Sequence, residues 1–466
     1  MTSPNKQFGN ISANAALILI PVITGLVAAY VGWLKWPDVL VDFGRELYVP
    51  WVLSKGHVLY VDVEYWNGPL SPYINALLFK LFGPSILTIE LFNILLICAA
   101  GVFVYRFYNR GSRPSQAPLI TASFLVLFAF AQFLWMGNYN FVTPYSHELT
   151  HGILIGFGAI WLLSAYSRHR RVWLMGLTGL FTGLALLTKV EVAVSVIAAV
   201  LLSISLLVWH ERPKPGRLAL ISSSFITGLL LPILLFAAYF AFHLSSFSAA
   251  LEKMFSSWLM MAGTGVSGGI FYKKVMGFDN LYLNLKLMGL SAAFYLALAA
   301  PLVANHLVRD SRVARQYGAY ISFALSALAL WPLRNSIPWF EAFRALPLFM
   351  FTAALVLFVK TVRGRAPDLH RHISFFAMAV FAFMLLLKMV LNTHIYHYGF
   401  ALAMPGALLL FYGLLSWAPS VMKKISGSAG VFYGSVMAVF TVMLLWHSGL
   451  SFELYSLKKT GCWQMA

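Results

Sequence analysis

Ionisable side chains are concentrated in one short segment of the chain, residues 42–73. Four of the 15 acidic residues in the 466-residue sequence lie there: Asp42, Glu46, Asp62 and Glu64. Three basic side chains lie among them: Arg45, Lys55 and His57. Ionisable groups are costly beside lipid, so a cluster of this kind between two long apolar runs indicates a functional site.

Carboxylates beside cations at a membrane surface suit the transfer of a sugar from a lipid-linked phosphate. The departing phosphate leaves as an anion and needs cations and hydrogen-bond donors. The acceptor hydroxyl needs a carboxylate that takes its proton, and a carboxylate also favours the positive charge that develops on the sugar ring. We expect Asp42 to be the catalytic base and Glu64 to be the second acid, which assists the acceptor or holds a metal.

Three basic residues are candidates for the phosphate: Arg45, Lys189 and Arg344. Arginine forms paired hydrogen bonds with a phosphate, whereas lysine supplies a point charge. Structural roles compete with these functions. Asp42 could cap a helix, and Lys189 with Glu191 could mark the end of a span whose lysine reaches toward the interface.

The second acid is ambiguous in the sequence. Asp62 and Glu64 alternate along the chain, and in an extended segment both would face the same way. Glu64 could also be an ordinary surface acid.

The composition predicts the element type that must position these groups. Of all residues, 60% are hydrophobic and only 10% are charged, and the mean hydropathy is +0.78. A soluble domain carries roughly 25% charged residues, so an all-α polytopic membrane protein is predicted. About 13 apolar runs are near membrane length, at about 13–33, 85–105, 117–136, 148–167, 172–188, 190–209, 218–242, 282–306, 317–333, 345–362, 373–391, 399–417 and 430–450.

The net charge of +18 is explained by orientation. Basic clusters follow every second span, which is the pattern of cytoplasmic loops and gives no indication of nucleic acid as a partner. The N-terminus is then cytoplasmic. The external segments are 34–84, 137–147, the short turn at Lys189, 243–281, 334–344, 392–398 and the C-terminal tail. The candidate site lies on this external face. Two cysteines, Cys98 and Cys462, make neither a disulfide framework nor a metal-finger spacing.

The first external loop, 34–84, has an internal order. Its apolar spacing predicts an amphipathic helix from Asp42 to about Leu53, ended by Lys55 and Gly56. A second surface helix is expected from Pro72 to Phe82. The external loop 243–281 is expected to be flexible, because the stretch Gly263–Gly269 is glycine-rich but lacks the sequence of a phosphate loop.

The first external loop resembles that of the C-type, membrane-embedded glycosyltransferases, in particular the dolichyl-phosphate-mannose protein mannosyltransferases and the bacterial lipid A aminoarabinose transferases. The similarity rests on Asp42, Arg45-Glu46, Gly56 to Tyr60 and Glu64 to Leu70. Two further segments are similar to family segments: Gly183 to Glu191 and His397 to Gly406. The family's second acid is replaced by Phe43, and its Lys-Pro-Pro-Leu is replaced by Asn67-Gly68-Pro69-Leu70.

The resemblance implies a single domain, 1–466, with a C-type glycosyltransferase fold. It implies transfer of a hexose or pentose from a polyprenyl phosphate to a lipid or glycan hydroxyl by inverting displacement, at the periplasmic face of a bacterial inner membrane. The expected substrate-binding residues are Arg45, Glu46, Asp62, Tyr65, His147, Lys189, Glu191, Arg344, His397 and Tyr398. A divalent metal held by Asp42, Glu64 and His147 is a further expectation, although no spacing requires one.

A transporter or flippase for a lipid or small solute is the alternative function. Such proteins show internal repeats and charges near mid-membrane. No obvious repeat is visible in this sequence, and most external-face charges lie at span ends, with Lys388 near the outer end of its span.

Overall fold

The computed structural model describes residues 4–109, 114–263, 269–297, 311–366, 368–397, 399–426 and 428–458. The structure is 79% helical and has no strand among these residues. This confirms the predicted class, an all-α membrane protein.

Eight helical segments among the described residues are long and apolar enough to cross a membrane. They are α4 (Ile86–Tyr108), α6 (His147–His169), α8 (Val190–Glu211), α9 (Pro215–Leu244), Trp339–Val362, Leu369–Met389, Phe400–Lys424 and α21 (Gly430–Leu457). Three of these segments join shorter elements: η3 (Trp339–Phe343) with α17 (Leu346–Val362), α18 (Leu369–Leu386) with η4 (Leu387–Met389), and α19 (Phe400–Tyr412) with η5 (Gly413–Trp417) and the start of α20 (Ala418–Ser426).

The five other predicted spans also contain helices. These are α1 (Pro4–Gly32), α5 (Gln116–Phe124) with η2 (Leu125–Ala129), α7 (Val172–Leu186), α14 (Leu281–Ala297) and α16 (Arg312–Leu333). The apolar parts of α5–η2 and α7, Gln116–Ala129 and Val172–Leu186, are shorter than the roughly 20 residues that cross a bilayer. Residues 298–310, which follow α14, lie outside the described part of the chain, so the total of thirteen spans remains a prediction.

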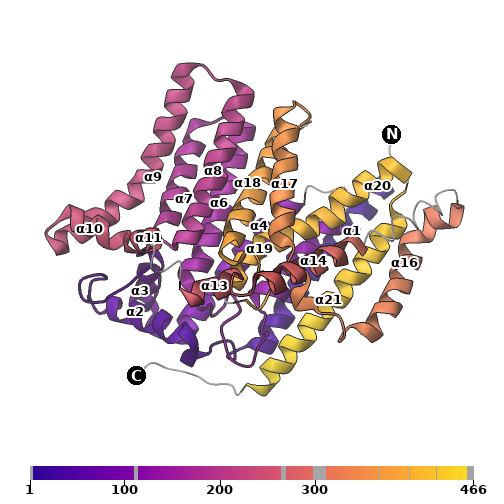
Figure 1. Ribbon diagram of the computed structural model, residues 1–466, viewed down its shortest axis with the longest axis horizontal. Helices are drawn as coiled ribbons and strands as arrows, with labels where there is room; N and C mark the ends of the chain where they lie inside the picture. Colours follow the sequence, from indigo (N-terminus) through magenta and orange to yellow (C-terminus); the bar gives the residue numbers. More distant parts are fainter. Residues whose placement is uncertain are drawn as a thin grey trace.

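Short helices gather at one end of the helical bundle. They are η1 (Val39–Phe43), α2 (Gly44–Ser54), α3 (Leu70–Phe82), α10 (Phe247–Met254), α11 (Ser256–Ala262) and α13 (Ile270–Met276). In Figure 1, α2, α3, α10 and α11 lie toward the lower end, whereas the α8–α9 and α17–α18 connections lie at the upper end. We call these the site end and the opposite end. Helices α2 and α3 lie where two helices were predicted in the first loop, and α2 ends at Lys55 and Gly56 as expected.

One predicted span stops early. The sequence suggested a span over 117–136, but the helical segment ends at Ala129 and the chain continues as irregular, buried backbone. Side chains of α21 satisfy that backbone: Tyr455 Oη donates to the carbonyl of Phe130 (3.1 Å), and Ser451 Oγ bonds both the N–H and the carbonyl of Gln132 (3.0 Å each). Non-helical backbone at membrane depth is stable only with such partners.

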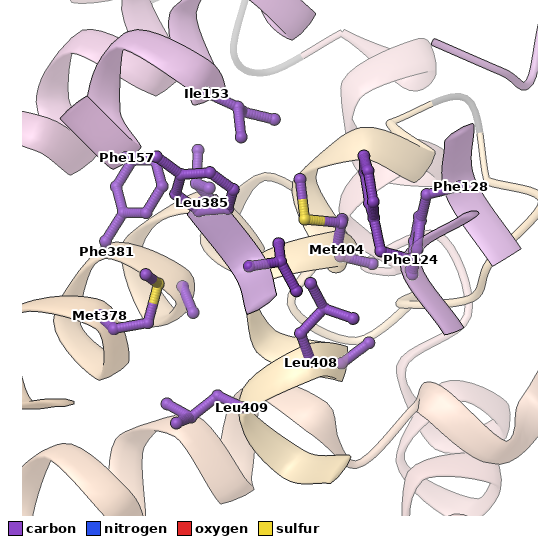
Figure 2. Packing of buried hydrophobic residues seen from close by; sticks show 14 of the residues in the cluster. Phe124, Phe128, Ile153, Phe157, Met378, Phe381, Leu385, Met404, Leu408 and Leu409 are labelled. Carbon is purple, nitrogen blue, oxygen red and sulfur yellow. The ribbon is translucent and has the colours of Figure 1, made fainter. Parts of the chain in front are cut away.

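The core packs α6, α18, α19 and the α5–η2 segment together (Figure 2). Phe157 of α6 lies beside Phe381 of α18, with ring centroids 6.3 Å apart. Gly156 makes this contact close, because a Cβ there would lie 2.8 Å from the Phe381 ring. The packing fixes α6 and α18 relative to each other, and both helices carry ionisable groups at the site end.

Helices α7 and α9 meet through glycines. A Cβ on Gly228 would lie 1.9 Å from the carbonyl oxygen of Gly176, and a Cβ on Gly179 would lie 2.0 Å from that of Phe225. The two backbones therefore touch, as in membrane helix pairs built on small residues.

Candidate functional site

Glu46 of α2 binds the first residue of α6. One oxygen of its buried carboxylate, Oε2, accepts the backbone N–H of His147 (2.9 Å) and lies 2.6 Å from its ring Nδ1. The other oxygen, Oε1, pairs with the Arg45 guanidinium at 2.6 Å. The ring of Phe43 also lies against His147, with centroids 6.0 Å apart. These contacts dock the first loop onto the N-terminus of α6.

The environment of Glu46 keeps it ionised. Burial alone would raise the pKa of this carboxyl, but the hydrogen bonds and charge of His147, together with Arg45, hold the pKa at about 2. On the far side of the imidazole, Nε2 lies 3.0 Å from the side-chain nitrogen of Asn93, which also donates to the carbonyl of Val142. Asn93 and Glu46 therefore hold the imidazole from both sides, with Nδ1 facing Glu46.

A second carboxylate lies next to His147 in the chain. Glu148 is fully buried, and its Oε2 accepts the Ser146 hydroxyl at 2.6 Å. Its Oε1 has no hydrogen-bond partner among the described residues. Burial and then the charge of Glu148 raise the pKa of Tyr60, which places the predicted Gly56–Tyr60 element beside the same helix end.

Lys189 joins the N-terminus of α8 to that of α6. Its Nζ lies 3.3 Å from Ser146 Oγ, 4.0 Å from a carboxylate oxygen of Glu191, and 5.0 Å from the ring centre of Tyr145. Glu191 in turn pairs with Lys388 of η4, directly after α18. Cations and carboxylates therefore alternate across the ends of three helices, and the N-termini of α6 and α8 add their positive dipole ends.

The first loop also reaches α8 through its backbone. The N–H of Gly68 donates to the carbonyl of Thr188 (2.7 Å), and the N–H of Leu70 donates to that of Leu187 (3.0 Å). A Cβ on Gly68 would lie 2.2 Å from the Leu187 carbonyl. Gly68, which replaces a proline of the resembled Lys-Pro-Pro-Leu motif, therefore lies where two backbones touch.

The segment that begins at His397 lies beside this charged region. His397 Nε2 donates to the carbonyl of Val275 (3.2 Å), and its Nδ1 accepts the N–H of Gly399 (2.9 Å). Burial and then His394 lower the pKa of His397 to about 3, with further contributions from Lys388 and Arg344. His397 is therefore neutral at pH 7.

Arg344 is buried and committed to internal contacts. It pairs with Glu341, and its Nη1 donates to Asn284 Oδ1 (2.8 Å) and to the carbonyl of Leu391 (3.1 Å). These contacts tie η3 to α14 and to the segment after α18. The geometry gives Arg344 a positioning role beside the site rather than direct access to a phosphate.

Asp42 lies at the exposed rim of the region. It precedes α2, and its backbone has φ +62° and ψ −30°, a conformation that is strained for a residue with a Cβ. Helix α2 has no side-chain cap, so the alternative role of Asp42 as its cap is not observed. Burial raises the pKa of Tyr139, with further contributions from Tyr396 and Asp42.

The other acids of the first loop differ in their contacts. Asp62 Oδ2 accepts the N–H of Val58 at 2.7 Å and lies 3.8 Å from His57 Nδ1, so it closes a local turn. Glu64 is exposed, and no hydrogen bond or ion pair joins its side chain to a described residue. Tyr65 is buried in an apolar cluster that joins the first loop to α9 and α10. Asp62 therefore has a structural role, which leaves Glu64 as the better second acid of the two.

The expected metal ligands do not come together. His147 is fully buried with both ring nitrogens engaged, whereas Asp42 and Glu64 are exposed. In the described part of the chain, no three His, Cys, Asp or Glu side chains form a group that could hold a metal ion. Tyr398 and the centre of the glycine-rich loop, 264–268, lie outside the described residues.

The sequence did not indicate two polar residues that take part in the charged cluster. Asn93 and Ser146 link the charged groups, yet neither belongs to a charge cluster. The available signal for Asn93 was an amide inside an apolar run, which needs a partner when it is buried.

Comparison with known proteins assigns no family. No protein-family model matches the chain, and no curated protein matches it significantly. The resemblance to membrane glycosyltransferases therefore rests on the first-loop segments and the two weaker ones.

Proposed function

We propose that this protein transfers a sugar from a polyprenyl-phosphate donor to an acceptor hydroxyl at the periplasmic face of a bacterial inner membrane. One observation carries the proposal: three segments far apart in the sequence converge at the linked N-termini of α6 and α8. Glu46 reaches His147, Lys189 reaches Ser146, and Lys388 reaches Glu191. The first loop, the Gly183–Glu191 segment and the region before His397 thus share one charged cluster.

The phosphate of the donor suits the part of the cluster around α8. Lys189 and Lys388 have side chains only 11% and 17% exposed, so their charges act in a setting less screened than bulk water. The N-termini of α6 and α8 favour an anion at the same place. The anionic polyprenyl phosphate that leaves would be stabilised there without a general acid.

The acceptor is assigned to the rim. Its hydroxyl oxygen attacks the anomeric carbon while the carbon–oxygen bond to the phosphate breaks, and the bonding electrons leave with the phosphate. The hydroxyl proton passes to the Asp42 carboxylate. Glu46 and His147 are positioning residues, because their contacts hold the start of α2, and with it Asp42, against α6.

A transfer assay with the purified full-length protein and polyprenyl-phosphate sugars tests this function. General-base catalysis contributes about 10²–10⁴-fold, so Asp42→Asn should lower the transfer rate by that amount. The matched control is Glu252→Gln, which removes an exposed acid on α10 at the same end and should leave the rate unchanged. Normal transfer by Asp42→Asn would show that Asp42 is not the base.

One observation favours transport as a second candidate function. Glu90 of α4 and His447 of α21 lie inside candidate spans, are buried, and have ring or carboxyl atoms without hydrogen-bond partners among the described residues. Such groups often mark solute or proton pathways. Proteoliposomes separate the two functions: movement of a labelled lipid or sugar that is lost in Glu90→Gln supports transport, and sugar transfer without any such movement supports the enzyme.

A further inference from the structure

A groove of about 810 Å³ lies at the opposite end of the bundle from the charged cluster. Helices α17, α18 and the α19–α20 segment form its walls. Its deeper part is apolar and is lined by Phe349, Met350, Val356, Leu409, Leu410 and Trp417. The mouth is basic and is lined by Lys360, Arg365, Arg371, His372 and Lys424, with Asp368 among them.

The single acid at the mouth is already engaged. Asp368 Oδ1 accepts the backbone N–H of Arg371 at the start of α18 (3.2 Å) and lies 2.8 Å from His370 Nδ1. Lys360, Arg365 and Lys424 are exposed, and no ion pair or hydrogen bond joins their side chains to a described residue. Three positive charges at the mouth therefore have no negative partner among the described residues.

The depth of the groove fits one leaflet of a bilayer. About 16 Å of helix rise separates Phe349 from Lys360 on α17, and half of the hydrocarbon core is about 15 Å. An acyl chain could lie along the apolar wall while a phosphate remains among the cations. An amphiphile with a negative head is the ligand that this shape and charge fit together.

We propose that the groove binds one anionic phospholipid from the leaflet at the opposite end of the bundle. The phosphate lies between Lys360, Arg365 and Lys424, and one acyl chain lies against the apolar wall. Because Lys360 and Lys424 come from different helices, the bound phosphate removes their mutual repulsion and holds α17 to α20. This inference does not depend on the proposed sugar transfer.

The chain offers a closely matched test of the charged mouth. Lys360→Ala/Lys424→Ala removes two cations of the mouth, whereas Arg363→Ala/Lys423→Ala removes two exposed cations of the same region that do not line the groove. Both double variants lower the net charge equally. Binding of phosphatidylglycerol and phosphatidylethanolamine to the purified full-length protein in detergent can be measured by native mass spectrometry.

Each cation near a phosphate contributes roughly fivefold to binding of an anionic lipid. The mouth variant should therefore bind phosphatidylglycerol about 25-fold more weakly than the wild type, whereas the control variant should bind almost normally. The proposal is overturned if both variants lose binding equally, if phosphatidylethanolamine binds as well as phosphatidylglycerol, or if a polyprenyl phosphate displaces phosphatidylglycerol at lower concentration.

A second variant tests the apolar wall without changing charge. Val356 is 44% exposed and lines the groove, so Val356→Trp should fill the space of the acyl chain and leave the protein folded. Phosphatidylglycerol should raise the unfolding temperature of the wild type, because a ligand stabilises the state that it binds, and should do so much less for Val356→Trp. An equal rise in both proteins would place the lipid elsewhere.

Discussion

Glu46 shows how the buried charges of the site end depend on one another. Both carboxylate oxygens have charged or polar partners, from Arg45 and His147, and its side chain is only 3% exposed. Charged groups are tolerated in such places only when they are paired and hydrogen-bonded. The loss of one member therefore leaves the others buried without compensation.

We expect Glu46→Gln to lower the free energy of unfolding by about 3–5 kcal/mol, the usual cost of breaking a buried pair. Glu64→Gln is the control, because this exposed acid should change stability by less than about 0.5 kcal/mol. Thermal unfolding of both variants in detergent measures the difference. Equal midpoints for the two variants would contradict the role of Glu46.

The pH dependence of stability follows from the same contacts. The pKa of Glu46 lies at about 2 in the folded protein and near 4.5 without these contacts, so the unfolded chain binds a proton between these values while the folded chain does not. The wild type should lose stability as the pH falls from 4.5 to 2. Glu46→Gln, which has no such group, should lose less over that range, as unfolding midpoints measured across it would show.

Residue types predicted which charged segments lie together better than they predicted the contacts within them. The acids of the first loop indicated the region, and Lys189 and Glu191 join it. The sequence could not show that Asp62 closes a turn or that Arg344 is committed to Asn284. Such contacts depend on the relative placement of segments far apart in the chain, which local patterns do not contain.

At the scale of elements, α7 and α9 depend on the absence of side chains at their contact. Gly176, Gly179 and Gly183 face α9, and Gly228 faces α7. In lipid there is little hydrophobic force between helices, so close packing of small residues supplies much of the association. This pair carries Lys189 at its site end, through the short turn after α7.

Gly228→Leu should separate α7 from α9, because the new Cβ would overlap the carbonyl of Gly176. We expect the free energy of unfolding to fall by about 1–3 kcal/mol or more, as in other overpacked cores. The yield of monodisperse protein should also be low. Gly289→Leu on α14 is the control, since nothing lies within 4 Å of a Cβ there. Size-exclusion chromatography and thermal unfolding measure both variants, and similar behaviour would show that the close contact does not matter.

Element types were predictable because apolar length and helix stop signals are local. Lys55 and Gly56 end α2 where the sequence suggested, and a helix lies in each predicted span. The early end of the α5–η2 segment was not predictable. The sequence continues past Ala129 with mostly apolar residues, and no proline marks the end of the helix. Its cause lies in Ser451 and Tyr455 of α21, more than 300 residues away.

At the scale of the whole molecule, the charges divide between the two ends. The cluster that mixes acids with cations lies at the site end, and the basic residues of the α8–α9 and α17–α18 connections lie at the opposite end (Figure 1). Basic loops remain in the cytoplasm. The site end is therefore expected to face outward.

Cysteine labelling tests this orientation in intact cells. In a background without Cys98 and Cys462, Glu64→Cys should react with a membrane-impermeant maleimide from outside, because Glu64 is exposed at the site end. Arg363→Cys, exposed at the opposite end, should react only after permeabilisation. Labelling of both from the same side would contradict the orientation.

The joint between Gly68 and Thr188 has an evolutionary consequence. Its hydrogen bonds join main-chain atoms only, so they persist whatever side chains flank them, provided that position 68 carries no Cβ. Position 67 can then diverge freely, and the lysine of the resembled motif can be lost without releasing the loop. Homologues of this chain should vary at 67 while keeping glycine at 68.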